Sequence, residues 1–220
     1  MGGRGASSAS SKLQEFYFDG GENSDLPWDR THPAMSPPKT LDEALGKKGR
    51  PMGMTNSYTG ANPFYSDSYR EYSENCQRCV VAYELRRRGY RVTAQPTFEG
   101  DRMPSSYEWI KAFDGAIRES VGGESVPQAR QNLQRKMESF GPGARAIVSV
   151  RKDGSLSRGH VFNAENIGGK ISYVDAQSGV RYDPKTILNG ASPSSVYVVR
   201  TDGLKVSDTV KDMVWTRGSR

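Results

Sequence analysis

The residues that could carry out chemistry are few, and they lie in two short segments. Both cysteines of the chain, Cys76 and Cys79, stand three residues apart at the expected start of a helix. Unsatisfied N–H groups and the helix dipole favour negative charge at that position, and the thiolate is the reactive form of cysteine. Of the two histidines, His160 begins a strand-like segment that leads to Asp175. A thiol, an imidazole and a carboxylate are the parts of a nucleophilic hydrolase site.

The residues from His160 to Asp175 have the pattern of a β-hairpin. A turn centred on Ile167 and Gly168 predicts that His160 lies directly opposite Asp175. Opposed residues point to the same face with Cβ atoms roughly 4.5–5.5 Å apart, so the two side chains could hydrogen-bond without help from other elements. The carboxylate would fix the imidazole tautomer and leave the other nitrogen for a thiol. A slip of one residue would move Asp175 off this face.

Each of these residues also has a plainer interpretation. A histidine beside an aspartate is usually structural, and a cysteine in an amphipathic helix is usually buried packing. A Cys-x-x-Cys helix start is typical of thioredoxin-like redox sites, but those need an apolar strand before the helix, and residues 68–74 are polar. Zinc held by Cys76, Cys79, His160 and Asp175 is conceivable, although structural zinc usually takes its ligands from paired motifs. We expect no cofactor and no metal.

The composition predicts one domain preceded by a polar segment. Only 35% of the 220 residues are hydrophobic and the mean hydropathy is −0.72, which is too polar for a chain packed throughout. Gly, Ser, Pro and Asp are concentrated in residues 1–58, which we expect to be disordered or loosely docked. The site-bearing domain is expected at residues 59–202, followed by a C-terminal extension at residues 203–220.

The net charge of +6 and the pI of about 9.3 allow contact with anions, but the charge is mild and spread out. The densest basic cluster, residues 86–88, is interpreted as a solvated helix end that complements the dipole. The chain has no aromatic–basic RNA signature and no DNA-reading motif, so we expect no nucleic-acid partner. It also has no bilayer-spanning apolar run and no secretory signal. We therefore expect a protein that is cytoplasmic as made, or delivered by a phage or a secretion system.

The periodicity changes from helical to strand-like along the chain. Helical signals cover three segments, residues 75–88, 107–113 and 126–140. A helical turn capped by Thr40 is expected at residues 41–45, and residues 47–60 read as loop. Period-two alternation covers four later segments, residues 145–150, 160–166, 170–176 and 195–200. This order predicts an α+β fold in which the cysteine helix packs on a C-terminal antiparallel sheet.

Six collinear stretches resemble a known family. They are NPFY (62–65), NCQRCV (75–80), AYELRRRGY (82–90), GARAIV (143–148), GHVFN (159–163) and VDAQ (174–177). With these stretches the chain resembles the papain-fold toxin family, a group related to glutamine-deamidating bacterial toxins, over about residues 60–200. The cysteine stretch is the most specific of the six. Ala176 stands where the family pattern has proline, a change of loop geometry that does not touch the site.

The resemblance implies a Cys-His-Asp site on a papain-like fold that acts on amide bonds. Carried over to this chain, His160 is the base, Asp175 orients it, and Gln177 has a supporting role. Either Cys76 or Cys79 is the nucleophile. The second cysteine of a similar pair reacts in papain-type enzymes, which keeps Cys79 open.

The residues themselves favour Cys76 as the nucleophile. Asn75 is a suitable N-cap and supports the start of the helix, and Cys76 stands beside it at the positive end of the dipole. Cys79 is a turn deeper, on the apolar face of the helix. Cys76 is therefore the expected nucleophile and Cys79 the alternative.

The resemblance further implies a cysteine-dependent amidohydrolase acting on protein carboxamides, either a glutamine deamidase or a cysteine peptidase. Such a toxin or effector would have a protein substrate and an immunity protein as a candidate partner. The glycine-rich start is similar to the openings of prophage-encoded head proteins. The alternative is therefore a phage- or virion-associated interaction protein that keeps the papain-like fold without catalysis.

Overall fold

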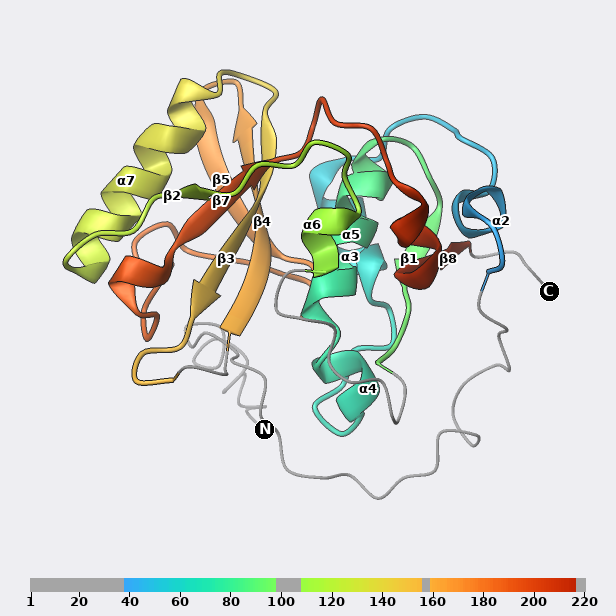
Figure 1. Cartoon of the computed structure of the whole chain (residues 1–220), viewed down its shortest axis with the longest axis horizontal. Coiled ribbons are helices and arrows are strands. Elements are labelled where there is room, and N and C mark those ends of the chain that lie inside the picture. The colour runs from blue at the N-terminus through green and yellow to red at the C-terminus, as the bar shows by residue number, and fades with distance from the viewer. Residues whose placement is uncertain (1–37, 98–107, 156–158, 217–220) are drawn as a thin grey trace, which may run out of the picture.

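A computed structural model describes residues 38–97, 108–155 and 159–216 (Figure 1). The first 37 residues of the expected N-terminal tail lie outside these ranges. Within them, the helices and strands form an α+β structure organised around one antiparallel sheet. The predicted fold class is therefore confirmed.

The main sheet has six strands in the order β2-β7-β3-β4-β5-β6, and every neighbouring pair is antiparallel. The bounds of the strands are Glu119–Ser120 (β2), Arg145–Arg151 (β3), Gly159–Ile167 (β4), Lys170–Asp175 (β5), Val180–Arg181 (β6) and Tyr197–Arg200 (β7). A short 3-10 turn, Pro193–Ser195 (η2), precedes β7. The four predicted strand segments correspond to β3, β4, β5 and β7, while β2 and β6 are short edge strands that the alternation did not indicate.

Helices cover both faces of this sheet. Helix α7 (Val126–Ser139) lies on one face, and α5 (Cys76–Arg87) lies on the other with α3 (Met54–Ala61) and α6 (Glu108–Lys111), as Figure 1 shows. Strand alternation divides the core accordingly. The α7-side core takes Ala146, Val148, Val150, Phe162, Ala164, Ile171, Tyr173 and Val198 from the sheet. The α5-side core takes Ile147, Val161, Val174 and Val199.

Local signals account for α7. The side chain of Ser125 accepts a hydrogen bond from the backbone N–H of Gln128, and Pro127 stands in the first turn. Its buried residues, Ala129, Leu133 and Met137, recur every fourth position and so form one stripe facing the sheet. The predicted helix over residues 126–140 is confirmed.

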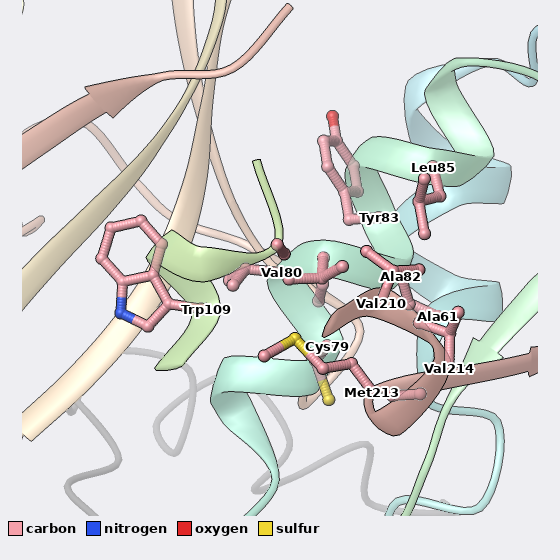
Figure 2. Packing of buried hydrophobic residues seen from close by; sticks show 14 of the residues in the cluster. Ala61, Cys79, Val80, Ala82, Tyr83, Leu85, Trp109, Val210, Met213 and Val214 are labelled. Carbon is pink, nitrogen blue, oxygen red and sulfur yellow. The ribbon is translucent and has the colours of Figure 1, made fainter. Parts of the chain in front are cut away.

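Helix α5 is an interior helix, because nine of its twelve residues are buried. Figure 2 shows Cys79, Val80 and Ala82 among side chains from α6 and from the C-terminal segment, including Trp109 and Met213. The helix ends at Arg87, close to the predicted end before Gly89. Gly89 has φ 103°, and a Cβ there would stand 2.3 Å from the carbonyl oxygen of Gly49, so this position requires glycine.

Two strands far apart in sequence form a second, smaller sheet beside α5. Strand β1 (Val92–Ala94) pairs with β8 (Val214–Thr216), and Gln95 extends this link by donating its side-chain N–H groups to the carbonyls of Lys211 and Val214. Helix α2 (Leu41–Leu45) and the 3-10 turn η3 (Asp208–Asp212) complete this region.

The N-terminal part of the described chain contains more helix than the sequence analysis predicted. The cap of α2 is confirmed, since the Thr40 side chain accepts from the N–H of Glu43 at 3.2 Å. The loop expected at residues 47–60 is wrong over its second half, where α3 forms. Its sequence, MTNSYTGA, has weak helix propensity, and packing against α5 stabilises the helix instead. The limits of the site-bearing domain stay a prediction, although Ala44 of α2 and Val214 of β8 share the core of α5.

The three arginines at the end of α5 all donate to groups inside the fold. Arg86 binds the carbonyl of Val92 at 2.9 Å, and Arg87 binds the buried carboxylate of Glu165 on β4. Arg88 binds the buried carboxylate of Glu84 at 2.7 Å, and Arg145 of β3 binds the same carboxylate at 2.8 Å. Interpreting residues 86–88 as a solvated helix end is therefore wrong. Glu84 and Glu165 are buried and need cationic partners, which these side chains supply.

Candidate active site

The hairpin of β4 and β5 positions the histidine and the aspartate. Ile167 pairs with Lys170 and Asn163 with Val174, so the turn consists of Gly168 and Gly169, both with positive φ. The predicted register is wrong by two residues. Side chains alternate between the two faces of a strand, so a shift of two residues leaves every side chain on its original face. His160 and Asp175 therefore still share a face.

The structure brings the side chains of His160 and Asp175 together. Nε2 of His160 lies 3.3 Å from Oδ2 of Asp175, and the two side chains are 0% and 1% exposed. Nε2 is therefore the nitrogen directed at the carboxylate.

The carboxylate of Asp175 receives several further donors. Its Oδ1 accepts from the backbone N–H of Gln177 at 2.9 Å, and its Oδ2 accepts from the hydroxyls of Ser178 at 2.9 Å and Tyr182 at 3.0 Å. Burial by itself would raise the pKa of Asp175. The attraction of His160 and the hydrogen bonds outweigh burial and bring the pKa below its usual value, so the carboxylate stays charged.

Tyr182 is a member of this cluster that the sequence analysis missed. It follows β6, and its backbone N–H donates to the carbonyl of Tyr173 at 2.9 Å. Its hydroxyl lies 3.4 Å from Nε2 of His160. Gly179, with φ 70°, was the available signal, because a tight turn there returns the chain beside β5 and brings Tyr182 next to Asp175.

The two cysteines have different environments, and both are free thiols. Cys76 is the first residue of α5, whereas Cys79 lies one turn along and donates its Sγ hydrogen to Oδ1 of Asn75 at 3.1 Å. An ionised Cys76 would help to raise the pKa of Tyr182, after burial and the effects of Asp175. Cys76 is therefore within electrostatic range of the hydroxyl that contacts His160 and Asp175.

Asn75 occupies the N-cap position as predicted, but its side chain makes no capping bond. Its Nδ2 donates instead to the carbonyl of Gln95 at 3.1 Å, and its Oδ1 accepts from Cys79. Asn75 thus ties the start of α5 to the segment after β1.

A junction around Asn62 ties the start of α5 to the end of β5. Nδ2 of Asn62 lies 2.8 Å from the carbonyl oxygen of Tyr72, 3.0 Å from that of Gln177, and 3.2 Å from Oδ1 of Asn75. Gln177 in turn donates from Nε2 to the carbonyl of Ser73 at 2.8 Å. Helix α4 (Arg70–Ser73) and the turn after β5 are thereby held against each other, directly before Cys76.

Residues 74–180 match the model of the family described as papain fold toxin 1, glutamine deamidase. Over this part, just under half of the chain, the sequence is similar to the papain-fold toxin family. The predicted family and its papain-like fold are confirmed. The papain-fold toxin segment contains both cysteines, His160, Asp175 and Gln177, and it ends two residues before Tyr182. The comparisons found no match among curated proteins and none among solved structures.

Two further findings concern only the residues that the structure describes. Among them, no group of three or more His, Cys, Asp or Glu side chains is arranged to hold a metal ion. None of the helices in the described ranges is long and apolar enough to cross a membrane.

Proposed function

We propose that this papain-fold toxin is a thiol amidohydrolase that deamidates glutamine side chains of a protein substrate. The observation that carries the proposal is the contact between Nε2 of His160 and Oδ2 of Asp175, which Gln177 links to the segment before Cys76. A carboxylate with this many hydrogen-bond donors resists taking up a proton. It therefore orients the imidazole and stabilises its charged form without becoming the base itself.

Cys76 is the nucleophile in this proposal. It stands at the first position of α5, where the helix dipole stabilises a thiolate, and a thiolate there would act on Tyr182 beside the His160–Asp175 pair. Cys79 is fully buried and its Sγ is directed at Asn75. We assign Cys79 the role of anchoring Asn75, which leaves it a structural neighbour of the reacting thiol.

The reaction proceeds in two steps. The Cys76 thiolate attacks the carboxamide carbon, and the protonated His160 gives its proton to the leaving NH2 group, which departs as ammonia and leaves a thioester. Water then attacks the thioester while His160 takes its proton, and the products are the carboxylate of glutamate and the regenerated thiolate. Backbone N–H groups of the first turn of α5 stabilise the oxyanion in both steps.

Gln177 and Asn75 support the site by position. Gln177 gives its backbone N–H to Asp175 and its side-chain N–H to the carbonyl of Ser73, so a single residue links the carboxylate to the segment before Cys76. Asn75 holds the other side of that segment through Gln95. In this role, Gln177 holds the start of α5 and the β4–β5 hairpin at a fixed distance from each other.

The test is an assay of the full chain on a glutamine-rich protein such as casein in water enriched in oxygen-18. Deamidation releases ammonia and converts glutamine into glutamate carrying one heavy oxygen, both read by mass spectrometry. We expect Cys76→Ala to abolish the signal and Cys79→Ala to retain most of it. The mechanism is wrong if both variants keep full activity on the same substrate.

The assay also separates the related chemistries. Cleavage of peptide bonds would keep the acyl-enzyme mechanism and make the protein a peptidase, and transfer to an added amine would make it an acyltransferase. A Cys76 thiol with ordinary reactivity towards iodoacetamide would support the interaction protein that keeps the fold without catalysis. An immunity protein that blocks the site and a phage or secretion route of delivery belong to the same proposal as a toxin.

A further inference from the structure

Tyr182 lies against the His160–Asp175 pair although it follows the segment that matches the family. Its hydroxyl donates to Oδ2 of Asp175 at 3.0 Å, the same oxygen that faces Nε2 of His160. The hydroxyl oxygen itself is 3.4 Å from Nε2. A hydroxyl has one proton to donate, so the proton of Tyr182 is committed to the carboxylate and only its oxygen faces the imidazole.

The fold holds this hydroxyl in place independently of the bond to Asp175. The backbone of Tyr182 pairs with that of Tyr173, and its ring meets the ring of Phe162 edge-on, with centroids 5.6 Å apart and planes at 79°. Backbone pairing and ring packing therefore pre-organise the donor.

The groups around the hydroxyl keep it protonated. Burial raises the pKa of Tyr182 well above its usual value, and the neighbouring charge of Asp175 raises it further. Cys76 from α5 and Tyr65 from the loop after α3 act in the same direction. The hydroxyl is thus a permanent donor throughout the pH range in which His160 would titrate.

We propose that Tyr182 is a positioning residue that lowers the proton affinity of His160 by weakening the carboxylate charge that faces the imidazole. The inference rests on the proposed function. A hydroxyl bonded to Oδ2 spreads the negative charge of Asp175, so the carboxylate attracts a protonated imidazole less strongly. The donor bond at 3.0 Å is shorter than the 3.4 Å approach to Nε2, and its effect dominates. Tyr182 thereby keeps His160 able to release the proton that the leaving group needs.

The test compares Tyr182→Phe with Tyr173→Phe in the full chain. Tyr173 is the matched control, because it is buried in the same core near Phe162 and its hydroxyl has no hydrogen-bond partner among the described residues. The His160 imidazole is titrated by nitrogen-15 NMR, with His32→Gln used to assign the second histidine. Tyr182→Phe should raise the titration midpoint of His160 by about one pH unit, the equivalent of one hydrogen bond to a charged group. Tyr173→Phe should leave the midpoint unchanged.

A second measurement follows the pH dependence of Cys76 alkylation by iodoacetamide in the Cys79→Ala background. If His160 forms an ion pair with the thiolate, the alkaline limb of this profile should move upward in Tyr182→Phe by the same amount. The inference is overturned if Tyr182→Phe and Tyr173→Phe give the same midpoint while Cys76 keeps its reactivity. A separate outcome tests the proposed function. If Cys76→Ala in otherwise wild-type protein does not change the titration of His160, Cys76 and His160 do not form the proposed catalytic pair, whatever the result for Tyr182.

A third variant covers the case in which Tyr182→Phe does not fold. Replacement of Tyr182 by 3-fluorotyrosine keeps the ring and hydroxyl but makes the phenol a stronger donor. The midpoint of His160 should then fall, the opposite direction to that expected for Tyr182→Phe. An unchanged or raised midpoint would contradict the inference.

Discussion

Two kinds of buried carboxylate stabilise this fold, and they differ in what faces them. Glu84 is buried between Arg88 and Arg145, whose guanidinium groups are charged at every accessible pH. Asp175 is equally buried, but its partners are an imidazole, two hydroxyls and a backbone N–H. A permanent cation locks a carboxylate into a structural role. Neutral donors and one titratable ring keep the carboxylate charged while leaving a proton free to move.

The largest expected effect is on activity when the charge at Asp175 is removed. Asp175→Asn keeps the shape of the side chain but presents no charge to His160, so the imidazole loses its preferred tautomer. The loss in kcat/KM for deamidation should be about 10⁴-fold, the scale seen when an analogous carboxylate is neutralised. A thermal melt of the same sample shows whether the variant is folded. Near-wild-type turnover would place Asp175 with the structural carboxylates.

Glu84→Gln should show the reverse pattern, a loss of stability without a specific loss of activity. It leaves Arg88 and Arg145 half-buried without their shared counter-charge, and the free energy of unfolding should fall by about 3 kcal/mol. Urea denaturation measures the loss, and kcat/KM per folded molecule should stay within a factor of a few. Lys111→Ala is the control, since its ion pair with Glu108 is 63% exposed on the lysine side and contributes little.

Asn62→Ala tests the junction between the two regions. Its Nδ2 serves three acceptors around the start of α5, so the substitution should cost about 2 kcal/mol and also lower kcat/KM. Asn132→Ala is the matched control, because Asn132 likewise donates to a backbone carbonyl, that of Gly122, but lies on α7. We expect the control to lose stability only. Equal kcat/KM in the two variants would show that the junction does not position the site.

The smallest expected effect is on acid stability. The folded-state pKa of Asp175 is below its usual value of 3.8, so the stabilisation is present above about pH 4 and is lost as the pH falls through the folded-state pKa. The difference in unfolding free energy between wild-type protein and Asp175→Asn should therefore shrink on acidification from pH 7 to pH 2. A difference that stays constant would mean that Asp175 is not charged in the folded protein.

Local signals in the sequence predicted most of the elements, and the parity of the hairpin predicted much of the site. The residues that cap α7, its buried stripe and the glycine after α5 all lie within a few residues of the element that they define. The prediction that His160 and Asp175 share a face was correct although the register was not. A shift by an even number of residues leaves each side chain on the same face of its strand. Neither result required knowledge of distant contacts.

Most of the features that sequence analysis missed depend on partners distant in the chain. Helix α3 forms because α5 packs on it, and Arg87 finds Glu165 seventy-eight residues away. The roles of Tyr182 and Asn62 follow from the structure, in which the segment after β5 lies beside the start of α5. The contacts of Arg87 with Glu165 and of Asn62 with Gln177 are long-range pairings, which the spacing of residue types along a chain does not encode. Tyr182 is different, because it lies seven residues from Asp175 and the turn at Gly179 is a local signal for its position.

The pairing of β1 with β8 also bears on the timing of synthesis. Domains fold progressively as the chain leaves the ribosome, but the core beside α5 includes Val210 and Val214, and Gln95 bonds to carbonyls in that same late segment. A nascent chain that has already exposed Cys76, His160 and Asp175 still lacks the strand that closes the small sheet. Packing of the thiol helix is thus complete only after the β8 segment has been translated.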